Sequence, residues 1–268
     1  MARPMPRVPP VTSAIFPASP RSTPEANYTP RIEIPPGLAG MLQDGPPVEP
    51  RPSATVIVLR GRSPFEVLMM RRPGGAEFAP NAYVFPGGSV HAEDHAFGDF
   101  SRAAAVRELF EELGVLMARR PGGRFARNRD CLALRELLGL GEAWGAALER
   151  LSLRPALDRL AFLARWITPE PLRRRFDARF FVCRLPAGQV EHPQAGEVVE
   201  WRWTSPAAAL ESLEMVFATR RILESIAPEP DAARLIRKLR RRREGPAILP
   251  RIVRKDGGFE VIPEPVRV

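Results

Sequence analysis

The sequence contains very few residues of several kinds, and each shortage excludes a class of protein. Two cysteines among 268 residues cannot make a disulfide framework or a four-thiolate zinc site. We therefore expect Cys131 and Cys183 to be buried thiols in a reducing, cytoplasmic setting. No stretch reaches the roughly 18 uninterrupted apolar residues of a membrane span, and the first residues lack the apolar segment of a secretory signal.

Lysine is also scarce, because 38 of the 40 basic residues are arginine. The formal net charge is +9, and the segment 234–243 alone supplies seven positive charges. Since much of the charge is local, it does not by itself indicate a nucleic-acid-binding protein. The basic segment still leaves open an arm that binds RNA or an anionic membrane.

Proline, in contrast, is abundant, and its distribution divides the chain. Of 31 prolines, 13 lie in residues 1–50 and six in residues 226–268. We expect residues 1–50 to be a proline-rich disordered tail, because proline interrupts helices and paired strands. Residues 51–225 form the predicted globular domain, and 226–268 a basic C-terminal helix and tail. The turn residues at 256–258 could add a short hairpin to that tail.

The central region mixes strands and helices. Helical periodicity around residues 126–165 predicts an insertion of two or three short helices. The expected fold class is α+β, an α-β-α sandwich with a mixed sheet. Predicted strands cover 54–59, 65–71, 82–85, 176–185 and 198–203, and further predicted helices cover 101–114, 206–213 and part of 215–240.

The helix predicted after Ser101 carries the strongest chemical signal. Its cap residues are Asp99 or Ser101 at the start and Gly114 at the end. At 100° per residue, its apolar residues share one side, while three glutamates share the other. Like charges at this spacing destabilise a helix unless a divalent cation lies between them, although a solvated acidic face is the simpler alternative. The apolar residues are Val106, Leu109, Phe110 and Leu113, and the acids are Glu108, Glu111 and Glu112.

The same helix resembles a known family. Residues Arg107–Val115 read RELFEELGV and match the R-E-U-x-E-E-x-G-U core of the Nudix hydrolase box, where U is apolar. Phe85–Gly88 reads FPGG, which commonly opens that box. The full pattern places a glutamate before the core, and this chain has Asp94 there, followed by five extra residues.

The longer spacing is typical of the branch that includes the peroxisomal coenzyme A diphosphatases. A later segment, Arg165–Pro169 followed by 174–181, is similar to that branch as well. The resemblance covers about residues 52–225. It implies hydrolysis of a nucleoside diphosphate derivative with Mg²⁺ or Mn²⁺.

The resemblance also implies roles for individual residues. Glu111 and Glu112 would be metal ligands, and Glu108 a ligand or the general base. Arg107 would pair with a helix carboxylate and orient it, while Gly87 or Gly88, with Gly88 preferred, would offer a carbonyl to the metal.

Further candidates lie outside the box. A distal acid would be Glu197 or Glu200, with Glu200 slightly preferred. His91 and His95 have a spacing that zinc sites use, but a third nitrogen or thiolate ligand is missing nearby, so we do not expect zinc. The arginines that would hold substrate phosphates, unless they are simply solvated, are Arg71, Arg72, Arg174, Arg175 and Arg179.

The leading functional hypothesis is a metal-dependent diphosphatase, with coenzyme A or an acyl-coenzyme A as the favoured small-molecule substrate. ADP-ribose, NADH or a nucleotide sugar would use the same chemistry. A binding module with the same fold but no catalysis is the alternative of a different class. The sequence leaves a homodimer open and does not favour nucleic acid.

Overall fold

The apolar run after residue 50 forms the centre of a mixed sheet. In the computed structural model, which describes residues 40–241, 244–255 and 258–265, β1 (Arg51–Gly61) and β2 (Phe65–Arg71) form an antiparallel hairpin. On its other side β1 runs parallel to β8 (Phe176–Arg184). Both pairings occur where the sequence predicts strands.

In the part of the chain that the structure describes, nine strands make up this sheet. Its order is β11-β10-β7-β8-β1-β2-β3, with β4 on β1 and β9 on β2. A separate two-stranded sheet pairs β5 (Ala118–Arg119) with β6 (Arg154–Pro155). The remaining strands are β3 (Tyr83–Val84), β4 (Gly87–Ser89), β7 (Ala161–Ile167), β9 (Glu200–Thr204), β10 (Ile248–Lys255) and β11 (Gly258–Pro265).

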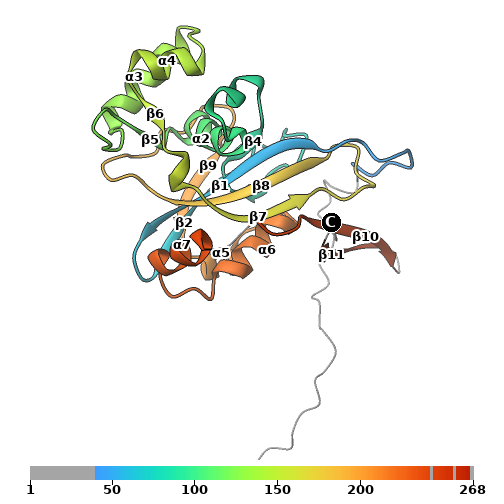
Figure 1. The fold of residues 1–268 in the computed structure, drawn as a ribbon. Coiled ribbons are helices and arrows are strands. Elements are labelled where there is room, and N and C mark those ends of the chain that lie inside the picture. The colour runs from blue at the N-terminus through green and yellow to red at the C-terminus, as the bar shows by residue number, and fades with distance from the viewer. Residues whose placement is uncertain (1–39, 242–243, 256–257, 266–268) are drawn as a thin grey trace, which may run out of the picture. The chain divides into compact units, whose positions relative to one another are not determined.

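Helices cover both faces of the sheet (Figure 1). One face carries α2 (Phe100–Leu113), with α3 (Asn128–Gly139) and α4 (Trp144–Arg150) beyond it. The opposite face carries α5 (Pro206–Ser212), α6 (Phe217–Ile226) and α7 (Ala232–Arg240). The predicted α+β class, with a mixed sheet between helices, is confirmed.

Alternation along β1 explains the two layers. Val56 and Val58 point into the apolar core under α2, whereas Ile57 and Leu59 point into the core under α5, α6 and α7. All four side chains are fully buried. Because side chains alternate across a strand, one central strand contributes to both cores.

The predicted helical insertion is partly wrong. Helices α3 and α4 and the short 3₁₀ turn η2 (Leu157–Arg159) match the expected short helices. Residues 161–165, however, belong to β7, which pairs with β8. Ala161, Phe162 and Leu163 are all buried, so the segment is apolar on both faces. A strand buried on both sides lacks the alternating pattern that would separate it from a helix.

Both ends of the predicted domain have structure beyond the expected limits. Residues 40–50 lie in the predicted tail, yet Met41 is buried and its carbonyl accepts a hydrogen bond from the Arg173 amide. The rest of that tail, residues 1–39, lies outside the described residues. After residue 225, α7 packs on the sheet and β10 pairs in parallel with β7, so this segment is part of the domain. β10 also pairs antiparallel with β11, as expected for a C-terminal hairpin.

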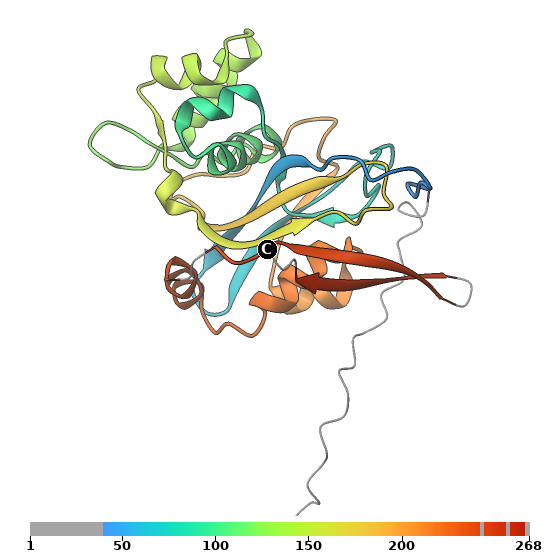
Figure 2. The ribbon, with the colours of Figure 1, turned by 45° about the vertical axis from the view of Figure 1, so that its right-hand side comes forward.

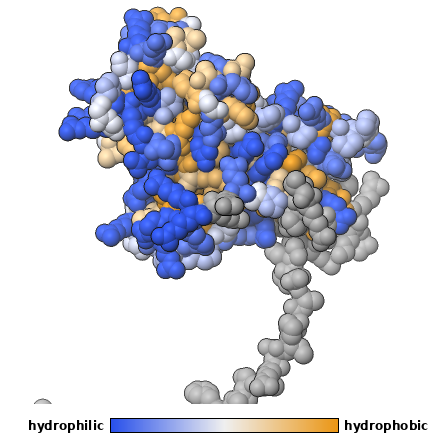
Figure 3. Space-filling model, in the orientation of Figure 1, coloured by the Kyte–Doolittle hydropathy of each residue, from blue (hydrophilic) through white to orange (hydrophobic). Residues whose placement is uncertain are grey.

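Helix α7 is strongly amphipathic. Leu235, Ile236 and Leu239 are buried, while Arg234 and Arg237 are exposed, and hydrophilic residues cover the region of α7 in Figure 3. In the stretches that the structure describes, none of the helices is both long and apolar enough for a bilayer crossing.

Candidate active site

Helix α2 begins and ends at the predicted residues. The Asp99 carboxylate accepts a hydrogen bond from the Arg102 amide (3.0 Å), which caps the helix N-terminus. Gly114 ends the helix with a left-handed φ of 70°, and its amide donates to the Phe110 carbonyl (2.8 Å). Local chemistry therefore fixes where the acidic residues lie along the helix.

The acidic side of α2 is less exposed than a solvated face would be. The Glu108 side chain is only 13% exposed, and Glu112 as a residue only 7%. Glu111 is the most open of the three, at 38% of its side chain. The alternative of a solvated acidic face therefore does not hold for Glu108 and Glu112.

The Arg107 guanidinium links the acids to the loop before the helix. It is fully buried, and one Nη donates to Glu108 (3.0 Å) and Glu111 (2.8 Å). The other Nη donates to the Ser89 carbonyl (2.9 Å). Arg107 thus orients helix carboxylates as its position in the sequence pattern implies.

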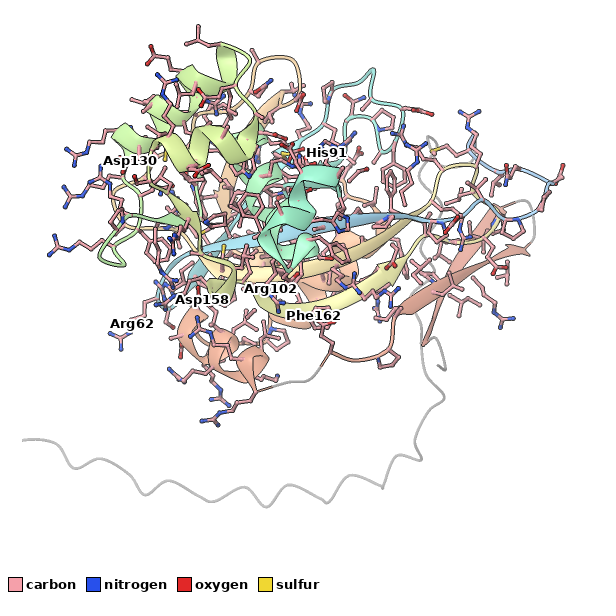
Figure 4. The ribbon with its side chains drawn as sticks, turned by 45° about the horizontal axis from the view of Figure 1, so that its top comes forward. Arg62, His91, Arg102, Asp130, Asp158 and Phe162 are labelled. Atoms are coloured by element: carbon pink, nitrogen blue, oxygen red, sulfur yellow. The ribbon has the colours of Figure 1, made fainter. Side chains whose placement is uncertain are left out.

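Asp94 supplies the remaining partner of Arg107. It lies in the 3₁₀ turn η1 (Ala92–Phe97), is fully buried, and accepts from Arg107 Nε (3.1 Å) and Nη2 (3.0 Å). The shorter acid and the five extra residues of the loop therefore still deliver a carboxylate to the arginine. His91 stands at the start of this turn, beside α2 (Figure 4).

The glycine turn approaches the acids closely. The Gly87 amide donates to Glu112 Oε2 (2.8 Å). A Cβ on Gly88 would lie 2.4 Å from the Glu108 carboxyl carbon, closer than any real contact. A side chain on Gly88 would therefore require the Glu108 carboxylate to move.

Burial changes the ionisation of the acids. It raises the pKa of Glu108 to about 7, with Arg107 opposing the rise and Glu111 adding to it. Burial also raises the pKa of Glu112 well above its ordinary value, and the neighbouring Glu108 adds to this. Clustered, desolvated carboxylates are destabilised as anions, and a cation among them would relieve that cost.

The donor set suits a hard divalent cation. Carboxylate oxygens beside backbone carbonyls are the ligands that Mg²⁺ and Mn²⁺ prefer. Across the described residues, no three Asp, Glu, His or Cys side chains converge into a ready cation site. Glu108 and Glu112 therefore suit a divalent cation because they offer buried carboxylate oxygens. Arg107 donates hydrogen bonds to Glu108 and Glu111.

The two candidates for a distal acid have different surroundings. Glu200 belongs to edge strand β9 and pairs with Arg202 and, at 3.5 Å, with Arg71. Glu197 lies in the loop before β9 and is close enough to raise the pKa of Glu112. That loop is tied to the end of α2, where the Gln194 amide donates to the Glu112 carbonyl (2.9 Å). The two acids therefore differ in setting: Glu200 is held in ion pairs at the sheet edge, whereas Glu197 is exposed in a loop tied to α2.

A cavity of about 340 Å³ opens beside the glycine turn. Gly87, Gly88, Arg72 and Arg174 are among its lining residues. Ser53 and Thr55 also line it, and they alternate with Ala54, which lies in the core under α2. The cavity therefore lies on the face of β1 opposite to α2. The glycine turn borders the cavity on one side and the acidic residues of α2 on the other.

The predicted phosphate-binding arginines separate into three groups. Arg72 and Arg174 line the cavity, where Arg72 Nε donates to the Phe78 carbonyl (3.0 Å) and Arg174 pairs with Glu77. Arg71 faces Glu200 at the sheet edge, and Arg179 donates to Ser101 (3.1 Å) at the start of α2. Arg175 is buried and donates to the carbonyls of Thr168 and Val48.

Most of the residues that line the cavity could not be predicted from the sequence. Its aromatic residues come from strands and a helix far apart in the chain, among them Trp166, Phe180 and Phe217. Trp166 is buried, and its ring lies edge-on to that of Phe217 with 5.9 Å between the ring centroids. The one available signal was the segment 165–181, which supplies Trp166, Arg174 and Phe180.

Comparison with known families agrees with this geometry. A model described as a NUDIX domain matches residues 49–134, and one described as the NUDT19 Nudix domain matches residues 98–223. Both describe the same kind of domain, and together they span β1 to α6. The chain belongs to the Nudix superfamily. Helix α2 with Arg107, Glu108, Glu111 and Glu112 is its Nudix helix.

Individual Nudix proteins are similar over part of their length. The chain is 35% identical to putative nudix hydrolase 7 of Caenorhabditis elegans over 154 residues, which are 58% of this chain and 51% of that protein. It is 29% identical to the human acyl-coenzyme A diphosphatase NUDT19 over 208 residues, 55% of each chain. The chain thus spans about half the length of the curated relatives it matches.

A solved Nudix structure is similar as well. The crystal structure of a NUDIX hydrolase from Alicyclobacillus acidocaldarius has 26% sequence identity to this chain and a TM-score of 0.64. The match covers 72% of this chain and 97% of that one. The resemblance to the Nudix fold and to the acyl-coenzyme A diphosphatase branch is therefore confirmed.

Proposed function

We propose that this chain is a metal-dependent diphosphatase that hydrolyses coenzyme A or an acyl-coenzyme A. One observation carries the proposal. The buried Glu108 and Glu112 carboxylates meet the glycine turn on one side, and the cavity with Arg72 and Arg174 borders that turn on the other. A polyanionic linkage at the turn would lie between acids that hold a cation and arginines that bind phosphate.

Each residue then has a task. Glu108, Glu111 and Glu112 would hold Mg²⁺ or Mn²⁺, with a carbonyl of the glycine turn as a further ligand. The bound ion supplies charge neutralisation and a more acidic water. Arg107 keeps two of the carboxylates oriented, and Asp94 keeps Arg107 in place.

Proton transfer needs a base near this cluster. Two acids are candidates: Glu108, where it is not itself a metal ligand, and Glu197, whose charge is felt at Glu112 from the loop before β9. Water oxygen bonds to one phosphorus, the bridging P–O bond breaks, and two phosphate monoesters leave. Arg72 and Arg174 would hold the substrate phosphates during this exchange.

Two alternatives keep the fold. ADP-ribose, NADH or a nucleotide sugar would place the same linkage at the same acids. A binding module without catalysis would not require Arg107, Glu108, Glu111 and Glu112 to be retained together. A reducing, cytoplasmic setting and a homodimer remain further proposals, the first consistent with the two buried free thiols.

The decisive experiment is a substrate panel with Mg²⁺ and Mn²⁺ compared in parallel. Coenzyme A, acyl-coenzyme A, ADP-ribose, NADH and a nucleotide sugar would be incubated with wild type and with Glu111→Gln. We expect monoester products from the coenzyme A compounds with wild type only. Turnover of ADP-ribose without turnover of coenzyme A compounds would refute the substrate, and full activity in Glu111→Gln would refute the site.

A further inference from the structure

The cavity beside the glycine turn is completed by a part of the chain that lies beyond both family matches. The two matches together reach residue 223, whereas Pro250 of β10 and Val261 of β11 line the cavity. β10 reaches it by pairing in parallel with β7, with Ile248 opposite Trp166 (Figure 2). Val261 is 4% exposed, so the hairpin is packed on the molecule at this point.

Much of the cavity wall is apolar, although Thr168 and Thr219 also line it. The apolar part contains Trp166, Phe180 and Phe217 together with the two hairpin residues, Pro250 and Val261. Such a surface is stabilised when it covers an apolar group of a ligand.

We propose that this apolar part of the cavity holds the acyl group of an acyl-coenzyme A. The proposal rests on the proposed function and assigns the specificity of the same site. The pantetheine arm, which separates the diphosphate from the thioester, would leave the glycine turn and bring the acyl chain against α6 and the β10–β11 hairpin. Phe217, Ala218 and Val261 are then specificity-determining residues.

A nucleobase fits this wall less well. Adenine carries donors and acceptors around its edge, and each would need a partner in a buried site. The Thr168 hydroxyl is already paired, because it accepts from the Phe176 amide (2.9 Å) and donates to the Phe176 carbonyl (3.3 Å). An acyl chain needs only apolar contact along its length.

The proposal predicts how affinity depends on chain length. Each methylene that becomes buried should tighten binding by about fourfold, until the cavity is full. Binding of coenzyme A and of its acetyl, butyryl, hexanoyl and octanoyl esters would be measured by calorimetry on Glu111→Gln, with Mg²⁺ present. Using the inactive chain separates binding from turnover.

Two substitutions on α6 change the size of the cavity in opposite directions. Ala218→Phe fills it, so affinity should stop rising at a shorter ester, with a loss of at least about tenfold for the octanoyl ester. Phe217→Ala enlarges it, so the rise should continue to longer esters. Ala207→Phe, at an exposed position on α5, is the matched control and should leave the series unchanged.

Three outcomes would overturn the assignment. A series that is flat in chain length means that the acyl group lies elsewhere. An equal loss for free coenzyme A and its esters in Ala218→Phe means that the cavity holds the nucleotide. If the dependence of affinity on chain length is the same in both α6 variants as in the parent, the cavity does not hold the acyl group. If wild type hydrolyses ADP-ribose but no coenzyme A compound, the proposed function itself fails, and that result is separate from a flat series with good coenzyme A turnover.

Discussion

The Arg107 guanidinium and the Asp94 carboxylate face each other in the interior, joined by hydrogen bonds of 3.0 and 3.1 Å with neither side chain exposed. The pair connects the 3₁₀ turn η1 to the Nudix helix. It also leaves one Nη of Arg107 directed at Glu108 and Glu111. Stability and orientation of the site therefore depend on the same ion pair.

Loss of the Asp94 charge should destabilise the fold. Asp94→Asn leaves Arg107 buried without its main counter-charge, and we expect the free energy of unfolding to fall by about 3 to 5 kcal/mol. Urea unfolding at neutral pH measures this. Asp158→Asn, which affects an exposed pair with Arg119, should cost less than about 1 kcal/mol, and equal losses in the two variants would contradict the argument.

Replacing Arg107 by lysine should affect activity more than its retained charge suggests. A lysine cannot reach Asp94, Ser89 and Glu111 together, because it lacks the planar fork. We expect kcat to fall by about 10- to 100-fold, as for other residues that orient a ligand of a metal. Steady-state kinetics of Arg107→Lys and of the control Arg119→Lys, a half-buried arginine on β5, would test this, and unchanged kcat in Arg107→Lys would exclude the orienting role.

A methyl group on Gly88 should displace the Glu108 carboxylate. The added Cβ would lie 2.4 Å from that carboxyl group, so the side chain must move. Misplacement by about an ångström can cost on the order of 100-fold in rate. Gly75→Ala has open space around it and should keep nearly full activity. If Gly88→Ala is as active as Gly75→Ala, Glu108 has no role at that position.

Glu112 should connect metal binding with stability. Without metal, Glu112→Gln removes a carboxylate whose anion is disfavoured by burial, so stability should be unchanged or higher. With Mg²⁺ at about 100 times its Kd, wild type should gain about 2.7 kcal/mol and the variant much less. Thermal unfolding with and without Mg²⁺ measures both. An equal gain in the two proteins would remove Glu112 from the ligand set, and the exposed Glu136→Gln serves as control.

The choice between the distal acids can be tested directly. Glu197→Gln should lower kcat by about 10- to 100-fold if its carboxylate serves as base or ligand near Glu112. Glu200→Gln, whose carboxylate is paired with Arg71 and Arg202, should change kcat by less than about threefold. The reverse order of effects would restore Glu200 as the functional acid.

The sequence predicted the parts of the site that local chemistry determines. Asp99, Gly114 and the spacing of the three glutamates all act within one helix, so its limits and its acidic side could be predicted. Asp94 was located by the family pattern, but its pairing with Arg107 depends on how the loop before the helix folds. β7 was mistaken for helix because it is apolar on both faces. The cavity could not be predicted, since β7, α6 and the C-terminal hairpin meet only in the folded sheet.

The alternation of β1 has a consequence for how this protein can change over time. Ala54 and Val56 lie under the helix that carries the acids, while Ser53 and Thr55 line the cavity on the other face. Substitutions on one face can therefore accumulate with little effect on the other. If the cavity holds the acyl group as proposed, a lineage could change its preferred acyl chain by altering α6 or the hairpin and keep the acidic helix unaltered.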